Sequence, residues 1–173
     1  LELDAENSSK AYTLAGAVAG SGTAAIGAAI NVVTISDTTR ASVDGTALEV
    51  SDKLDVNAAA NATTKTLAIA GALAGTASIA GSNTSNFIDN TTEASIAGVT
   101  AQGTGVTGDV TVRADTRGKT YSLAGALAVG GTAGVGAASS VNSIAGSTTA
   151  RVDGSVFEAI SGLDVEAESN SLI

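Results

Sequence analysis

Hydrophobic and polar residues alternate strictly in the first five residues, LELDA. Leu1, Leu3 and Ala5 fall on one face, and Glu2 and Asp4 fall on the other. A period of two with a single apolar face predicts a half-buried β-strand. The pattern returns as LDVNA at 54, VTVRA at 110 and LDVEA at 163. The strand residues predicted to face a core are Leu1, Leu3, Leu54, Val56, Val110, Val112, Leu163 and Val165.

Long stretches of small apolar residues separate these strands. The first, TLAGAVAGSGTAAIGAAINVVTIS at 13–36, returns in related form near 67 and near 121. Residues 14–35 carry no charge and are long enough to cross a bilayer as a helix, but each glycine costs a helix up to about 1 kcal/mol relative to alanine. The connecting segments also show no clear Lys/Arg bias between alternate sides. We therefore expect no membrane insertion by this segment, but one or two strands that are apolar on both faces and broken near 20–22 and 130–131.

The chain is built from internal repeats. Leu14, Ile69 and Leu123 open three copies of a unit of a hydrophobe followed by Ala-Gly-Ala, or a close variant of it, which sets a period of about 54 residues. The predicted repeats are residues 1–53, 54–109 and 110–162, and residues 163–173 begin a further one. Because the chain starts and stops in the same phase, it looks like an excerpt from a longer array.

A repeat that cannot enclose a core alone, yet offers the same strands in every period, is typical of a solenoid. The predicted fold is all-β, a parallel β-helix in which each repeat supplies two or three coils of roughly 18 to 27 residues. The segments ASVDG and ASIAG end at Gly45 and Gly98, where a turn can use a positive φ.

Three asparagines follow the small-residue stretches at near-equivalent places, namely Asn31, Asn86 and Asn142. One interpretation is an inward ladder that hydrogen bonds up and down the stack. The other is three unrelated turn asparagines, since Asn is common in turns. The sequence does not decide between them.

Composition argues against catalysis, metal binding and nucleic-acid binding. The 173 residues contain no Cys, His, Met, Pro or Trp, and the net charge is −9. Such a surface is a poor partner for nucleic acid, and the commonest general base is missing. Asp37, Asp44, Asp52 and Asp55 lie in one repeat, but Asp44 and Asp55 recur in phase as Asp153 and Asp164, as solvated turn residues do. We predict no enzyme, no catalytic residue and no cofactor; Ca²⁺ on the acidic turns is the minor alternative.

The segments LAGALAVGGTAGVGAASSVNSIAGSTTARVDG and GVTGDVTVRAD resemble the repeat arrays of filamentous-haemagglutinin-like bacterial adhesins, most closely the leukotoxin-type filamentous adhesins. The resemblance covers the whole chain. It implies a right-handed parallel β-helix that is secreted by a type V route and displayed at the bacterial cell surface or released outside it. It also implies a rigid rod that projects or contributes to adhesion, and a receptor or glycan on a host or neighbouring cell as the partner of the parent protein.

Two alternatives concern the surface of the array. Its own side face could bind a receptor or glycan, and Tyr12 and Tyr121, at equivalent positions, could stack on sugar rings. Leu67 holds the corresponding place in the middle repeat, which favours ordinary strand packing. A polysaccharide-degrading β-helix is the weakest alternative. An excised array also exposes two uncapped ends, so end-to-end self-association of this fragment is expected.

Overall fold

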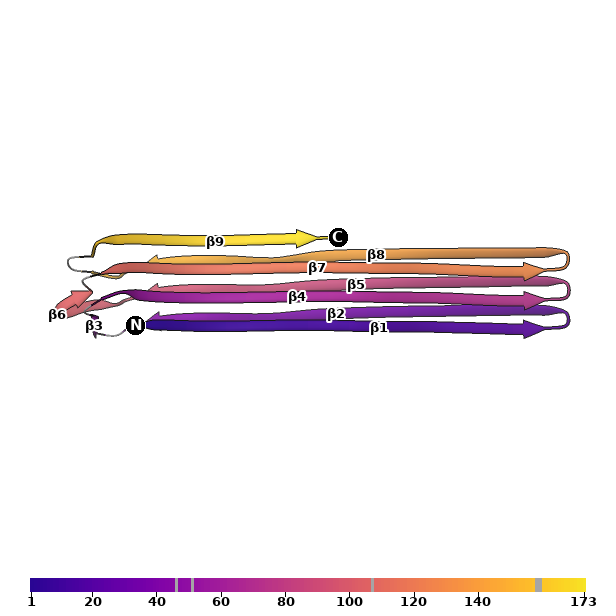
Figure 1. Ribbon diagram of the computed structural model, residues 1–173, viewed down its shortest axis with the longest axis horizontal. Helices are drawn as coiled ribbons and strands as arrows, with labels where there is room; N and C mark the ends of the chain where they lie inside the picture. Colours follow the sequence, from indigo (N-terminus) through magenta and orange to yellow (C-terminus); the bar gives the residue numbers. More distant parts are fainter. Residues whose placement is uncertain (46, 51, 107, 158–159) are drawn as a thin grey trace.

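The computed structural model is a flattened stack of long strands that run side by side (Figure 1). It describes residues 1–45, 47–50, 52–106, 108–157 and 160–173. The strands are β1 (Glu2–Ser21), β2 (Ala24–Asp44), β3 (Ala47–Val50), β4 (Leu54–Ala74), β5 (Ala77–Ala97), β6 (Thr100–Val106), β7 (Asp109–Gly130), β8 (Ala133–Asp153) and β9 (Gly162–Leu172). The described residues form no helix, and so none that could cross a membrane.

All strand pairings between coils are parallel. The sheets have the orders β1-β4-β7-β9, β2-β5-β8 and β3-β6. The first two, which we call the four-stranded and three-stranded sheets, face each other across a thin core. β3 and β6 lie beyond one end of the long strands (Figure 1). The prediction of an all-β parallel solenoid is confirmed.

The expectation of two or three coils per repeat is wrong, because each repeat forms a single coil. Leu3 is the Cα partner of Val56, and Val56 is the partner of Val112, so one full repeat separates neighbouring strands. The long strands hold 20 to 22 residues each and continue through glycines such as Gly16 and Gly71. Glycine weakens a strand but does not end it where both flanking strands remain in register. The array therefore rises by about 4.8 Å per repeat.

Turns occur where the sequence predicted them. β1 ends at Ser21 and β2 begins at Ala24, while β7 ends at Gly130 and β8 begins at Ala133. At the other end of the long strands, Gly45, Gly98 and Gly154 have φ of 54°, 61° and 54°. The three glycines occupy one stacked turn, in which Gly45 donates to the carbonyl of Ala97 and Gly98 to that of Asp153. These positions favour glycine because it adopts a left-handed backbone conformation without the steric cost of a Cβ.

The core changes character along the strands. Near β3 and β6 it is built from branched side chains, and Leu54, Val56, Val110 and Val112 are fully buried. Near the turns between long strands it is made of alanines such as Ala68, Ala70 and Ala72. Between these zones lies a polar layer of Thr, Asn and Ser side chains. The small inward residues allow the two sheets to approach closely at the end of the long strands where β1 turns into β2.

The remaining predicted core residues belong to the end coils. Leu3 is half-buried and packs against the core. Leu1, Leu163 and Val165 are 56%, 51% and 43% exposed. Leu163 and Val165 lie on β9, at one end of the four-stranded sheet, and Leu1 directly precedes β1 at the other, so each lacks a neighbouring coil on one side.

Candidate interaction surface on the four-stranded sheet

The outward face of the four-stranded sheet is divided into two halves. Alternate residues of each strand point outward, and stacking places them in rows across the coils. From Glu2 to Lys10, and at the matching positions of β4, β7 and β9, these residues are mostly charged or polar; we call this the charged half. From Tyr12 to Gly20 and at the matching positions of β4 and β7 they are mostly apolar; we call this the apolar half.

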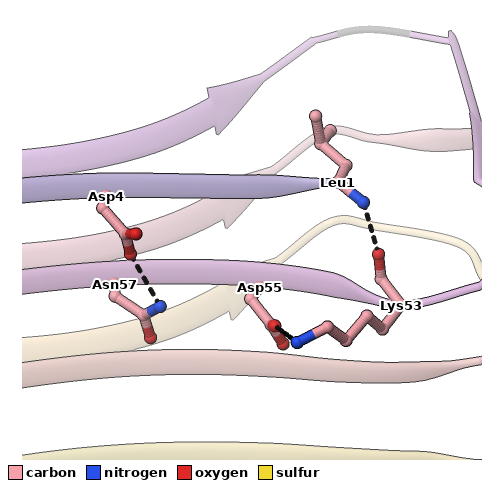
Figure 2. Close-up of polar contacts among 5 residues, drawn as sticks. All are labelled: Leu1, Asp4, Lys53, Asp55 and Asn57. Carbon is pink, nitrogen blue, oxygen red and sulfur yellow. Dashed lines mark hydrogen bonds and ion pairs between the residues drawn. The ribbon is translucent and has the colours of Figure 1, made fainter.

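Ion pairs and hydrogen bonds join neighbouring coils in the charged half. Asn57 donates to the carboxylate of Asp4 at 2.8 Å (Figure 2). Arg113, on the next coil in the same row, lies 3.0 Å from Glu166 and 3.4 Å from Asp164. These side chains are about half exposed, so each pair contributes little to stability.

Lys53 and Asp55 form the shortest of the ion pairs among the described residues, with Nζ and Oδ2 2.6 Å apart (Figure 2). The hydrogen bond to Asp55 raises the pKa of Lys53 above its usual value. The hydrogen bond from Lys53 lowers the pKa of Asp55, against partial burial, with a further contribution from Thr111. The Lys53 carbonyl also accepts a hydrogen bond from the amino group of Leu1 at 2.6 Å, so this residue ties the start of β1 to the next coil.

The boundary between the halves is a row formed by Tyr12, Lys65 and Tyr121. The Lys65 ammonium lies 5.6 Å from the ring centroid of Tyr12 and 5.7 Å from that of Tyr121, within the range of a cation–π contact. With the leucine row beside it, this row lines an open hollow of about 410 Å³. Sequence reasoning placed Leu67 between the tyrosines; Leu67 instead lies one row further on, between Leu14 and Leu123.

The apolar half is the feature that sequence reasoning missed. Apart from its glycines, its outward side chains are larger than the alanines beneath them, and Leu14, Val18, Leu123 and Leu127 are 65% to 82% exposed. The alternation of hydrophobic and polar residues is plain only in the flanking strands, because Ala and Gly dominate this stretch and obscure which residues face outward. The positions of Leu, Ile and Val at every second residue carried the signal.

The structure brings together two of the three predicted asparagines. Asn86 and Asn142 are Cα partners on adjacent coils, and the Asn86 amide donates to Asn142 Oδ1 at 2.8 Å. Asn31 lies opposite Thr84 instead, and its Oδ1 accepts a hydrogen bond from Thr13 across the core. Asn31 therefore also faces inward, but it lies one row away from the pair of Asn86 and Asn142.

Of the four aspartates singled out in the first repeat, three lie near the end of the long strands that adjoins β3. Asp44 ends β2, Asp52 is exposed before β4, and Asp55 is engaged by Lys53. Asp37 occupies an inward position of β2, opposite Asn90 on the next coil. Among the residues that the structure describes, no three Asp or Glu side chains converge as a metal site would require.

Comparison with family models, with curated proteins and with solved structures finds no match to this chain. What it does must be argued from the fold and its surfaces.

Proposed function

We propose that this chain is a structural repeat segment of a large secreted or surface-displayed bacterial adhesin, and that it forms part of a rigid extracellular rod. The rod would project an adhesive domain or contribute to adhesion along its length. The bacterial and adhesive parts of the proposal rest on the sequence resemblance. The rod rests on geometry.

The observation that carries the rod is the unbroken parallel register of the long strands from coil to coil. β1 and β2 stand at one end of their sheets, and β9 and β8 stand at the other. Both ends can therefore accept further coils without changing the pairing, and β9 already begins the next one over β7. An array built this way lengthens by one strand spacing per repeat.

Solution scattering from arrays of three, six and nine repeats tests the proposal. A continuous stack should grow by about 5 Å per repeat along the stacking direction only, while its width stays at the roughly 70 Å that a 21-residue strand spans. An increment of roughly 25 Å or more would mean that each repeat folds as a separate bead, and the rod would be abandoned.

A second candidate function is recognition of a glycan by the side face. The row of Tyr12, Lys65 and Tyr121 favours it, since both rings are about half exposed or more beside an open hollow. Aromatic faces stack on sugar rings, and the lysine could pair with an acidic sugar. Binding of the isolated chain to immobilised glycans, lost in Tyr12→Ala and Tyr121→Ala but kept in Tyr12→Phe, would make this the primary function.

A further inference from the structure

In the apolar half of the four-stranded sheet, the placement of large and small hydrophobic side chains is the reverse of that in an ordinary solenoid wall. Its larger hydrophobic side chains face outward, while Ala68, Ala70 and Ala72 beneath them are fully buried. Contiguous apolar patches of this kind mark interaction sites on soluble proteins. The question is what covers this one.

In two adjacent rows of this face, large side chains alternate with glycines from coil to coil. One row contains Gly16, Ile69 and Gly125, and the next contains Val18, Gly71 and Leu127. A Cβ at Gly16 or Gly125 would have nothing within 4 Å, so both are open depressions beside the projecting Ile69. Two rows in which projections and depressions alternate out of step can interdigitate with the same rows of a second copy, as the sheets of steric zippers do.

Charge favours the same occupant. The chain carries a net charge of −9, yet outward residues of the apolar half include only one charged side chain, Lys65, at its boundary. Two acidic copies repel wherever their charged halves approach. If the copies run in opposite directions, the apolar halves overlap while the charged halves extend to opposite sides.

The open ends of the array argue against a lipid cover. Within these 173 residues β1 and β8 are the last strands of their sheets, so their outer edges carry backbone groups that no other described strand pairs. Inserting the turn end into hydrocarbon would strip water from these groups at several kcal/mol each. Packing face to face against another protein leaves the edges in water.

The available area sets the expected strength. About 10 residues at 3.3 Å, across three coils spaced at 4.8 Å, give on the order of 450 Å² per copy. A stable complex of standard size buries about 800 Å² per partner. This chain should therefore pair weakly, and a longer array should pair progressively more tightly.

We propose that the apolar half of the four-stranded sheet is a contact surface for a second copy of this chain, packed face to face, so that neighbouring rods associate laterally. This inference does not depend on adhesion. It also differs from end-to-end association, which would use the open edges of the end coils.

Sedimentation equilibrium of the 173-residue chain, from about 10 µM to about 1 mM at 150 mM NaCl, measures the pairing. We expect a monomer–dimer equilibrium within this range. Ile69→Lys, on the proposed surface, should weaken dimerisation by at least about tenfold, because a two-fold contact buries the new charge twice. Ile79→Lys is the matched control: Ile79 is 53% exposed against 50% for Ile69, and it points outward from the other sheet. It should change the dissociation constant by less than about twofold.

Methyl NMR on the unmodified chain gives a readout that needs no variant to fold. On dilution, methyl signals of Leu14, Ile69 and Leu127 should shift, while those of Ile26 and Ile79 should not. A monomer throughout the range would overturn the proposal. So would a dimer disrupted by Ile79→Lys alone, which would move the contact to the three-stranded sheet, or one disrupted by neither variant, which would indicate end-to-end association. Co-sedimentation of a monomer with neutral phosphatidylcholine vesicles, lost in Ile69→Lys, would replace the second copy with lipid.

Discussion

Asn86 donates one amide hydrogen to Asn142 Oδ1 on the next coil and the other to Thr66 Oγ1 across the core, at 2.8 and 2.9 Å. Asn142 in turn donates to Ser122 at 2.8 Å, so one connected network links the two sheets and two coils. Buried networks of this kind fix relative position, because an alternative register would leave polar groups unpaired. The polar layer thus fixes the register of a solenoid whose adjoining core rows are largely alanine.

Replacement of Asn86 by Ala should destabilise the chain by about 2 to 3 kcal/mol, because it removes the donor to Thr66 Oγ1 in the buried layer and the shorter of two hydrogen bonds to Asn142 Oδ1. Urea unfolding followed by circular dichroism measures the loss. Asn61→Ala, on the half-exposed outer side of β4, is the control and should change stability by no more than about 0.5 kcal/mol. Equal effects of the two substitutions would remove the special role of the network.

Close approach of the two sheets at Gly27 gives a second prediction. A Cβ at this position would lie 2.2 Å from the Gly71 carbonyl oxygen, which is backbone and cannot move aside cheaply. Gly27→Ala should therefore cost about 1 to 3 kcal/mol of unfolding free energy through overpacking. Thermal unfolding of Gly27→Ala beside Gly16→Ala tests this, because a Cβ at Gly16 meets open space. If Gly27→Ala is as stable as Gly16→Ala, the sheets are further apart than described.

The sequence predicted the fold class because the flanking strands alternate cleanly and recur in phase. It failed to set the register inside the small-residue stretches, and the failures share one cause. Asn31, Leu14 and Tyr12 were each matched to a residue of the middle repeat two positions too far along, at Asn86, Ile69 and Leu67. A two-residue slip keeps every side chain on its own face, so alternation cannot detect it. Only contacts between coils, such as the polar network, resolve it.

The pattern of hydrophobic and polar residues also could not predict the number of coils per repeat. Glycines inside an apolar stretch are compatible with a turn or with a continuous strand, and Gly71 lies in the middle of a strand while Gly75 lies in a turn. Whether a glycine lies in a strand or in a turn depends on whether the neighbouring coils continue to pair with the chain at that position, which a single repeat does not reveal. The outward apolar half depends on the same information, since it exists only once three coils align their exposed side chains.

The stacked turn at Gly98 gives a prediction about backbone conformation. Its φ of 61° is left-handed, and a Cβ there would meet only ordinary contacts with Gly45. The cost of Gly98→Ala should therefore be conformational, about 1 to 2 kcal/mol, with no steric contribution. Gly98→Asn should cost less, because Asn tolerates this region. Urea midpoints that rank Gly, Asn and Ala in that order would support this account, whereas equal losses for Asn and Ala would point to a steric cause.

The pair of Lys53 and Asp55 predicts a pH dependence with a defined sign. Because the folded-state pKa of Asp55 is lowered, its contribution to stability is present above the unfolded-state pKa, near 3.8, and is lost as pH falls through the folded-state value. The pKa of Lys53 is raised, so its contribution is complete below 10.5 and is lost as pH rises through the higher folded-state value. Both groups are near the surface, so the effect should be a small shift of the urea midpoint.

Asp55→Asn isolates this effect. The difference in urea midpoint between the variant and the unmodified chain should be constant from pH 5 to pH 9 and should shrink towards zero below the lowered pKa of Asp55. Asp164→Asn is the control at the equivalent position of the last coil, where Arg113 lies 3.4 Å away and both side chains are more than half exposed. Between pH 5 and pH 9 its effect on the urea midpoint should be smaller than that of Asp55→Asn, because water screens a longer and more exposed pair. A midpoint difference for Asp55→Asn that persists unchanged at pH 2 would mean that the asparagine perturbs packing and that the ion pair contributes nothing.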